Sequence, residues 1–462
     1  MIGTDAILGF VLFWGVWLFV PLLIDGTTAV AYFIGALRAR KRYSRRVEEK
    51  ELSYYPLISI IVPVYNGEGV ISNCLDSLRR QTYPHQRLEI LVVDNLSNDR
   101  TLEIIREQQT VPFGGTVQYL SLPYQGKVGA LNAGIHRVNG EIIFNLDADT
   151  ILHVDALLEM AREFQADPKL AAATGAIEIT SVEGKGLHPL KYAMAEAEYL
   201  EYYTGFNIGR QYQSETGSLF TLAGAFSAFR RDVLHRTFLY DQRTVSEDTS
   251  LTLHITTRFP EMSVRCIATA VAYVDPVPSL SALYAQRVRW QRGQIEVAAL
   301  YPSLERHPFR LRGISLPKSL LIDHTLAFPR VVWTFLLPTM WFIGYPLSLV
   351  ISGMITMYFI YMFVDAMYMI VAYILADELN RKRIRKHWWI FTFMPAYRWT
   401  TFWFRFGGFL TVMTEGKSWR VRDPWTESAI GVQRVGTTTL TFLTQSFLPR
   451  ISAVLSGILR TR

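Results

Sequence analysis

A short apolar run that ends in two acids constrains the fold of this chain more than any other stretch. Residues 142–144 are apolar and mostly β-branched, which predicts a buried parallel strand. The run leads into Asp147-Ala148-Asp149. Residues i and i+2 of an extended segment point the same way, so both carboxylates face one point. Because open α/β sheets bind ligands at the carboxyl edge of their strands, we expect a ligand site here.

The two acids also indicate which kind of ligand the site binds. Carboxylates a few ångströms apart repel each other, and a hard divalent cation relieves that repulsion while a diphosphate supplies further oxygen ligands. The alternative is a surface turn, since aspartate is common in turns. The apolar strand favours the metal site, so we expect Asp147 and Asp149 to hold a hard divalent cation, which the family resemblance described below implies to be Mg²⁺ or Mn²⁺.

Strand and helix patterns alternate before and up to this stretch, which predicts a doubly wound, mostly parallel sheet. Strands are predicted at 57–62, 89–93 and 117–120, with a fourth that begins at 141 and ends at Asp147. Helices are predicted at 70–80 and from about 100, and a loop leading into a helix at 126–138. Pro63, Asp94 and Asp147 each follow or end a strand. They should therefore lie on one edge of the sheet.

Composition points to a membrane protein with more than one domain. The 462 residues exceed one ordinary domain, 50% of them are hydrophobic, and the apolar residues are clustered. The net charge of +7 comes from basic residues beside apolar runs, which favours a membrane surface over nucleic acid. Cys74 and Cys266 have no paired spacing, so we expect core residues rather than a disulfide framework or zinc site.

Apolar segments lie on both sides of the predicted sheet. Residues 7–37 can span a bilayer as one tilted or kinked helix, and the lack of an early basic region argues against a cleaved signal peptide. Residues 326–345 and 346–376 predict a membrane hairpin, and basic clusters after both apolar regions place the sheet domain in the cytoplasm. Residues 387–413, which are aromatic but contain Pro395, predict an interfacial or re-entrant segment.

These observations divide the chain into seven parts. They are an N-terminal transmembrane helix (1–37), a basic linker (38–56), the sheet domain (57–275), interfacial helices (276–318), a transmembrane hairpin (319–376), the aromatic segment (387–413) and a tail with an amphipathic helix (414–462).

Four acidic or aromatic elements follow one another in a characteristic order. Asp94, Asp147-x-Asp149, Glu247-Asp248 and Gln286-x-x-Arg289-Trp290 lie in sequence between two membrane regions. This resembles the inverting, membrane-embedded family 2 glycosyltransferases that include cellulose, chitin, hyaluronan and poly-N-acetylglucosamine synthases. The resemblance covers about residues 53–293 and the flanking membrane architecture. It implies a cytoplasmic α/β domain of GT-A type, a doubly wound mixed sheet flanked by transmembrane and interfacial α-helices.

The resemblance implies roles in donor binding for residues before Asp147. Pro63, Tyr65 and Asp94 would line the pocket of the nucleotide base, although Asp94 could instead cap a helix. Residues 126–132 resemble the family's Gly-Lys-x-x-Ala-Leu-Asn signature. Lys127, at a helix N-terminus, would suit a diphosphate, the alternative being an exposed lysine without a role.

The Glu247-Asp248 pair is implied to be catalytic. Asp248 would deprotonate the acceptor hydroxyl, which attacks the sugar carbon opposite the leaving group in a single inverting displacement. In the family a threonine often precedes the pair, whereas here Ser246 does, and both hydroxyls suit a helix N-cap. The alternative is an ordinary charged helix start.

The Gln286-x-x-Arg289-Trp290 element resembles the one that distinguishes chain-extending synthases. Gln286 and Arg289 would contact the donor, with Arg289 pairing to the diphosphate, and Trp290 would face the terminal sugar of the acceptor. Phe226 and Arg230 are further candidates for the acceptor pocket. Alone, a basic aromatic helix beside a membrane segment is usually an interfacial anchor.

The implied activity is transfer of sugars from a nucleotide-sugar donor, a UDP-sugar in particular, to a growing polysaccharide that is extruded across the plasma membrane by a multi-pass protein. The partners would be this donor, a polysaccharide or glycolipid acceptor and the lipid bilayer, with no nucleic acid. One alternative is a non-processive enzyme that adds a single sugar to a lipid or short acceptor. Another is a catalytically silent sugar-nucleotide sensor.

Some residues stay open between two interpretations. Arg330 and Asp365 lie inside predicted spans, where they could line a polymer path or pair with each other. Trp419 could belong to a gate over the site or be an interfacial tryptophan. His136 and His254 have no metal-like partners and are expected to be structural.

Overall fold

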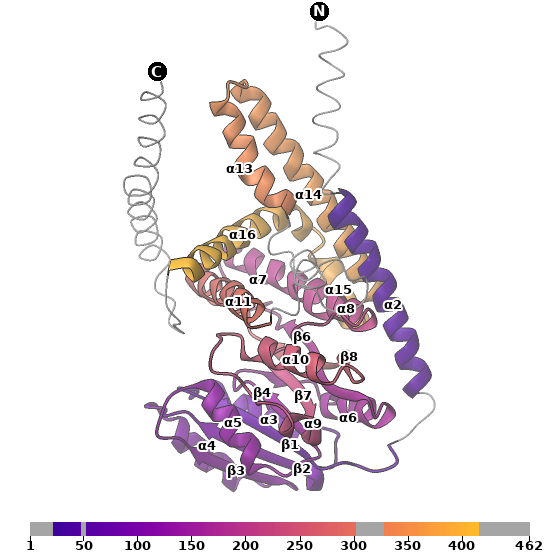
Figure 1. Cartoon of the computed structure of the whole chain (residues 1–462), viewed down its shortest axis with the longest axis vertical. Helices are drawn as coiled ribbons and strands as arrows, with labels where there is room; N and C mark the ends of the chain where they lie inside the picture. Colours follow the sequence, from indigo (N-terminus) through magenta and orange to yellow (C-terminus); the bar gives the residue numbers. More distant parts are fainter. Residues whose placement is uncertain (1–21, 48–51, 302–327, 415–462) are drawn as a thin grey trace, which may run out of the picture.

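A computed structural model describes residues 22–47, 52–301 and 328–414 (Figure 1). Its centre is an eight-stranded mixed sheet with the order β3-β2-β1-β4-β7-β6-β8-β5. The strands are β1 (Ile58–Val64), β2 (Leu88–Asp94), β3 (Thr116–Ser121), β4 (Ile142–Leu146), β5 (Ile151–Leu152), β6 (Leu170–Ile179), β7 (Phe226–Arg230) and β8 (Ser263–Val274).

One half of the sheet is parallel, as the alternation of strands and helices predicted. β1 pairs in parallel with β2 and β4, and β2 pairs in parallel with β3. The other half differs, because β7 runs antiparallel to both β4 and β6. The prediction of a mostly parallel sheet is therefore correct only for β1 to β4, and the sheet as a whole is mixed.

Both faces of the sheet are buried, which explains the nearly continuous apolar strands. Along β1, Ile60 and Val62 enter one hydrophobic cluster, whereas Ile61 enters the other. The helices of this domain are α3 (Ile71–Arg79), the 3₁₀ helix η2 (His85–Arg87), α4 (Thr101–Thr110), α5 (Lys127–Arg137), α6 (Ala156–Ala166), α9 (Arg231–His235) and α10 (Glu247–Arg258).

A layer of helices separates the sheet from the apolar hairpin (Figure 1). It contains α7 (Pro189–Tyr202), the π-helical η3 (Tyr203–Gly209), α8 (Arg210–Glu215), α11 (Leu280–Leu300) and α16 (Ile390–Thr414). α16 lies along α11 and also contacts α7 and α14. Trp388 and Trp399, at and near its start, are exposed. The interfacial placement of this segment stays a prediction.

The predicted hairpin consists of α13 (Phe328–Phe342) and α14 (Leu347–Leu375), which pack side by side beyond the helical layer (Figure 1). The turn contains Gly344, and Pro346 is the N-cap of α14. Within the described residues, α14 alone is long and apolar enough to cross a bilayer. Its 29 residues span about 44 Å at ~1.5 Å each, more than a hydrocarbon core of ~30 Å.

The N-terminal helix α2 (Thr27–Val47), preceded by the π-helical η1 (Leu22–Gly26), continues through the basic cluster that was predicted to be a linker. It packs against α8 and α14. A Cβ on Gly35 would lie 2.7 Å from the ring of Tyr212, and one on Gly209 would lie 2.8 Å from the ring of Tyr32. Each glycine therefore lets a tyrosine of the opposite element approach closely.

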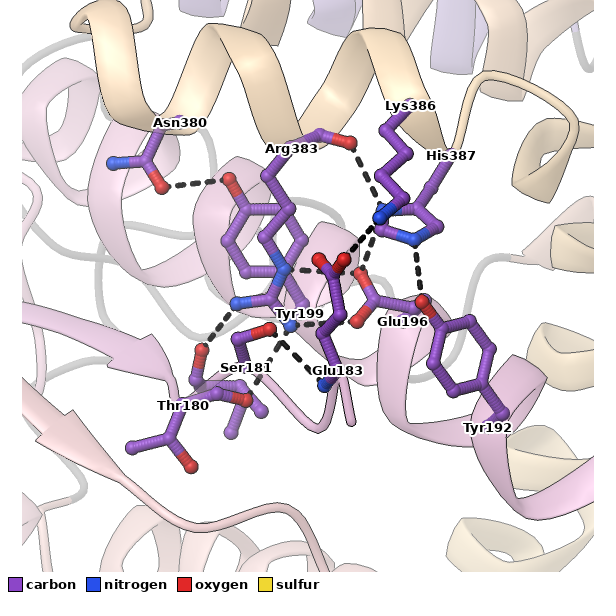
Figure 2. Close-up of polar contacts among 11 residues, drawn as sticks. Thr180, Ser181, Glu183, Tyr192, Glu196, Tyr199, Asn380, Arg383, Lys386 and His387 are labelled. Carbon is purple, nitrogen blue, oxygen red and sulfur yellow. Dashed lines mark hydrogen bonds and ion pairs between the residues drawn. The ribbon is translucent and has the colours of Figure 1, made fainter. Parts of the chain in front are cut away.

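The basic helix α15 (Glu378–Lys386) binds the sheet domain (Figure 2). The guanidinium of Arg383 donates to both carboxylate oxygens of Glu196 at 3.0 and 2.9 Å and lies 3.7 Å from the ring centre of Tyr199. Lys386 pairs with Glu183. Arg383 and Lys386 were predicted only as a cytoplasmic flank of the hairpin, and here they fasten that hairpin to α7 and to the loop after β6.

Asp365 of α14 pairs with Arg398 of α16, with 2.7 Å between Oδ1 and Nε, and both side chains are buried. Asp365 thus has a buried partner on α16, and its suggested pairing with Arg330 stays a prediction. The side chain of Arg330 lies outside the described residues, as do Trp419 and the predicted tail and most of the first predicted span.

Cys74 and Cys266 are buried and free, as expected.

Candidate active site

The loops after β1, β2 and β4 meet at one edge of the sheet, as predicted. Val64 at the end of β1 is in register with Asp94 at the end of β2, and Asp147 directly follows β4. The backbone N–H of Asp147 donates to the carbonyl oxygen of Ala225 at 3.0 Å. This bond brings the segment before β7 alongside the two acids.

Lys127 joins three elements at this edge. Its Nζ lies 2.5 Å from Oδ1 of Asp147 and 3.7 Å from Oε1 of Glu247. Lys127 is the first residue of α5, and Glu247 is the first residue of α10. The lysine and the catalytic candidates, far apart in sequence, thus form one cluster.

Gly224 marks the point on which this cluster converges. A Cβ there would lie 3.4 Å from Oδ2 of Asp248 and 3.6 Å from Nζ of Lys127. The other carboxylate oxygen of Asp248, Oδ1, accepts from the N–H of Thr249 at 2.6 Å. The side chain of Asp248 is therefore held by its own helix while Oδ2 faces the cluster.

Burial and mutual charge shift the pKa values of Glu247, Asp248 and Lys127 in this cluster. Burial raises the pKa of Asp248 and of Glu247, and the negative charge of Asp248 raises that of Glu247 further while Lys127 opposes the rise. Burial lowers the pKa of Lys127, but the carboxylates of Asp147 and Glu247 outweigh that effect and raise it overall. Such shifts are typical of functional sites.

Asp149 lies at the exposed rim of the same edge. Partial desolvation and then the charge of Asp147 raise its pKa, which is the repulsion expected for two neighbouring carboxylates. In the described ranges, no group of three or more His, Cys, Asp or Glu side chains could hold a metal by itself. The two acids thus fit a cation only if a ligand supplies the remaining oxygens.

The residues proposed for the nucleotide base lie at the same edge, away from the lysine. Asp94 is 1% exposed, and its carboxylate accepts from the N–H of Ser97 at 3.2 Å and from the hydroxyl of Ser121 at 3.1 Å. These bonds show that Asp94 stabilises the loop after β2. Its two suggested roles, contact with the nucleotide base and capping of a helix, stay predictions. Pro63 is buried in β1, whereas Tyr65 is exposed and its hydroxyl accepts from Gln125 at 3.0 Å.

Gly126 connects this base region to the lysine. Its N–H donates to Oδ1 of Asn95 at 2.7 Å, and its φ of +147° is a conformation that side chains rarely adopt. Asn132, at the end of the same signature, exchanges two hydrogen bonds with the backbone of Tyr240 at 2.9 and 3.0 Å. The signature therefore shapes the loop and the start of α5.

The Gln286-x-x-Arg289-Trp290 element lies on α11, which contacts the start of α10. Gly293 packs directly against Ser246, the residue before Glu247. Arg289, one turn earlier on this face, is exposed. Gln286 donates to the hydroxyl of Tyr202 at 3.3 Å.

Trp290 is half-buried against a small aromatic group. Its ring centre lies 5.4 Å from that of Phe206 and 6.3 Å from that of Tyr202. Arg287, between the motif positions, is fully buried with its guanidinium 4.5 Å from the ring centre of Trp290. The sequence interpretation missed Arg287, although the i, i+4 spacing from Leu283 could have placed it on the buried face.

The structure does not bring Phe226 and Arg230 to the site. Phe226 is 0% exposed and stacks on Phe144 inside the core. Because β7 is antiparallel to β4, Arg230 pairs with Ile142 at the opposite edge, where it donates to the carbonyl of Leu170 at 2.8 Å. Neither side chain therefore lies in the cluster, although both were candidates for the acceptor pocket.

The fold and this cluster define a class of protein. Residues 59–238 match the family model described as glycosyl transferase family 2. Residues 59–238 of the sheet domain therefore resemble the family 2 glycosyltransferases.

Among curated relatives, the chain is 28% identical over 243 residues to a poly-beta-1,6-N-acetyl-D-glucosamine synthase of Staphylococcus epidermidis, which covers 52% of this chain and 55% of the relative. It is 24% identical over 273 residues to a probable glycosyltransferase, YdaM, of Bacillus subtilis, covering 56% of this chain and 60% of the relative. The chain thus matches these relatives over little more than half of their length.

The chain also has a likeness to solved structures. One is the mannosyltransferase PcManGT from Pyrobaculum calidifontis in complex with GDP-Man and Mn²⁺, with a TM-score of 0.48 and 19% identity, which covers 86% of this chain and 99% of that one. TarS 1-349 of S. aureus in complex with UDP has a TM-score of 0.40 and 16% identity, covering 76% of this chain and 91% of that one.

Proposed function

We propose that this chain is an inverting glycosyltransferase that moves sugars from a UDP-sugar to a growing polysaccharide. The observation that carries the proposal is the convergence of Lys127, Asp147, Glu247 and Asp248 at one edge of a family 2 domain. The names of the staphylococcal relatives make UDP-N-acetylglucosamine the first donor to test.

In this proposal Asp248 is the general base. Oδ1 is occupied by the N–H of Thr249, which leaves Oδ2 to take the proton of the acceptor hydroxyl. The hydroxyl oxygen then bonds to the anomeric carbon as the bond to the diphosphate breaks, so one displacement inverts the centre. A pKa raised by burial makes the Asp248 carboxylate a stronger base than an exposed aspartate.

Lys127 and the two acids after β4 serve the donor. Lys127 neutralises negative charge where the diphosphate leaves, from the start of a helix that favours anions. Asp147 and Asp149 would hold Mg²⁺ or Mn²⁺ against the diphosphate. The bound cation would act as a Lewis acid that stabilises the departing nucleotide.

The acceptor side uses the motif of α11. Trp290 would offer a flat apolar surface to the terminal sugar, while Gln286 and Arg289 would contact the donor. The apolar helix α14 and the exposed tryptophans near α16 support a bilayer beside the domain, with the domain in the cytoplasm and the product leaving through the membrane helices. A multi-pass arrangement and a processive reaction belong to the same proposal.

The test is a donor screen with the full chain in lipid nanodiscs and Mn²⁺. We expect nucleotide release from UDP-N-acetylglucosamine and a ladder or smear of products in gels when N-acetylglucosamine oligomers are supplied. A single glycolipid product would instead favour the non-processive enzyme. Neither release nor transfer from any nucleotide sugar would favour the silent sensor and overturn the proposal.

A further inference from the structure

Arg287 is an unusual residue to find at full burial. It is 0% exposed, although it lies on a helix whose neighbouring Arg289 faces solvent. A guanidinium removed from water destabilises the fold unless charged and polar partners surround it. Arg287 therefore needs a set of partners, and these come from two other helices.

Its partners are Glu201 of α7 and Tyr397 of α16. Nη2 of Arg287 lies 2.5 Å from Oε2 of Glu201 and 3.1 Å from the hydroxyl of Tyr397. That hydroxyl donates to the same oxygen of Glu201 at 2.9 Å. Burial raises the pKa of Glu201, whereas the positive charges of Arg287 and Arg405 lower it. The net effect is a lowered pKa, so the side chain of Glu201 is an ionised carboxylate.

The same guanidinium contacts Trp290. It lies 4.5 Å from the centre of the indole ring, within the range of a cation–π interaction, while Phe206 meets the ring edge-on. These two contacts, one with a cation and one with an aromatic ring, restrict the orientation of the indole.

We infer that Arg287, held by Glu201 and Tyr397, is a positioning residue that fixes Trp290 for the sugar acceptor. This rests on the acceptor role proposed for Trp290. Arginine suits the task because its planar group can bond a carboxylate along its edge while a flat face lies over a ring, which a lysine ammonium cannot reproduce. Since Tyr397 belongs to α16, this helix helps to position the acceptor side of the site.

The test compares Arg287→Lys with the wild-type full chain in nanodiscs, using UDP-N-acetylglucosamine and an N-acetylglucosamine oligomer. We expect the KM for the oligomer to rise about tenfold while the KM for the donor and the rate of donor hydrolysis without acceptor stay the same. Tyr397→Phe keeps the ion pair and should raise the oligomer KM only about two- to threefold.

Arg383→Lys is the matched control (Figure 2). Arg383 also pairs with a buried glutamate of α7, Glu196, and also lies over an aromatic ring, that of Tyr199, but not near Trp290. We expect its oligomer KM to equal that of the wild type. An equal change in both lysine variants would mean that Arg287 only stabilises α7, and would overturn the inference.

A readout independent of turnover separates this inference from the proposed function. With 5-fluorotryptophan incorporated, the ¹⁹F resonance that disappears in Trp290→Phe belongs to Trp290. It should shift or broaden in Arg287→Lys and stay unchanged in Arg383→Lys. An unchanged resonance in Arg287→Lys overturns the inference even in an active enzyme, whereas an inactive wild-type chain overturns the proposed function alone.

Discussion

Lys127 is the residue on which the candidate site depends most directly. It comes from the start of α5, yet it pairs with Asp147 after β4 and approaches Glu247 at the start of α10. Without its charge, the carboxylates of Asp147, Glu247 and Asp248 would repel one another. The lysine thus lets the acids stay close together before any donor binds.

The first prediction concerns Asp248. Asp248→Asn should lower the rate of sugar transfer by about 10²- to 10⁴-fold, because the amide cannot accept the proton of the acceptor hydroxyl. Affinity for the donor should stay within about twofold, since Oδ1 is held by the N–H and the hydroxyl of Thr249, at 2.6 and 3.3 Å, on its own helix. Turnover assays and calorimetric titration with the nucleotide sugar measure the two effects. Wild-type turnover in this variant would remove Asp248 as the base.

Asp149→Asn tests the other end of the cluster. We expect donor binding to become weaker and to lose its dependence on Mn²⁺, because one of the two carboxylates for the cation is gone. Titrations with and without Mn²⁺ measure this. Equal dependence on Mn²⁺ in the variant and the wild type would exclude Asp149 as a ligand.

Sequence reasoning located the acids but not all their surroundings. Asp94, Asp147 and Asp248 carry a chemical signal in their residue type and in the strand or helix beside them. Phe226 and Arg230 do not, because their side chains are directed by the antiparallel pairing of β7, and nothing in their local pattern reveals that strand direction.

At the scale of elements, α15 determines how the hairpin meets the domain. Besides Arg383 and Lys386, it presents Asn380, which donates to both oxygens of Glu178 on β6 at 3.2 and 3.1 Å. Burial raises the pKa of Glu178 to about 7. The sequence indicated a basic flank, but partners that lie about 200 positions away are found only in the folded chain.

The raised pKa of Glu178 predicts a dependence of stability on pH. Its ordinary pKa is 4.5, so the folded state binds a proton that the unfolded state releases between pH 4.5 and 7, and this contribution to stability is lost as pH rises through 7. In Glu178→Gln this loss should be absent. The free energy of unfolding of the variant, minus that of the wild type, should therefore rise by up to about 3 kcal/mol between pH 5 and pH 8.

Thermal unfolding in detergent at the two pH values measures the difference. Glu183→Gln is the control, since Glu183 is exposed, and its hydrogen bond with Lys386 lowers its pKa. It should show little change over this range. The same pH profile for Glu178→Gln and the wild type would contradict the assignment.

At the scale of the whole molecule, buried charge pairs join the apolar helices to the helical layer. Asp365 of α14 and Arg398 of α16 are 2% and 8% exposed. Asp365→Ala should lower the free energy of unfolding by about 3–5 kcal/mol, because it leaves a buried arginine without its counter-charge. Unfolding of the full chain in detergent measures the loss.

The double variant Asp365→Leu with Arg398→Leu is the matched control. It removes both charges and keeps much of the apolar volume, so it should recover most of the stability. A double variant as unstable as Asp365→Ala would mean that packing, rather than the uncompensated charge, sets the loss.

The two glycine–tyrosine contacts of α2 have a mechanical consequence. With Tyr212 against Gly35 and Tyr32 against Gly209, each ring packs where the opposite element has no Cβ, so the two contacts favour one register of α2 against η3 and α8. α15 also fastens the hairpin to the domain. If this chain extends a polymer, we therefore expect the motion that admits each new sugar to come from side chains and loops at the sheet edge. The helices α2 and α15 would stay in place while the product moves past them.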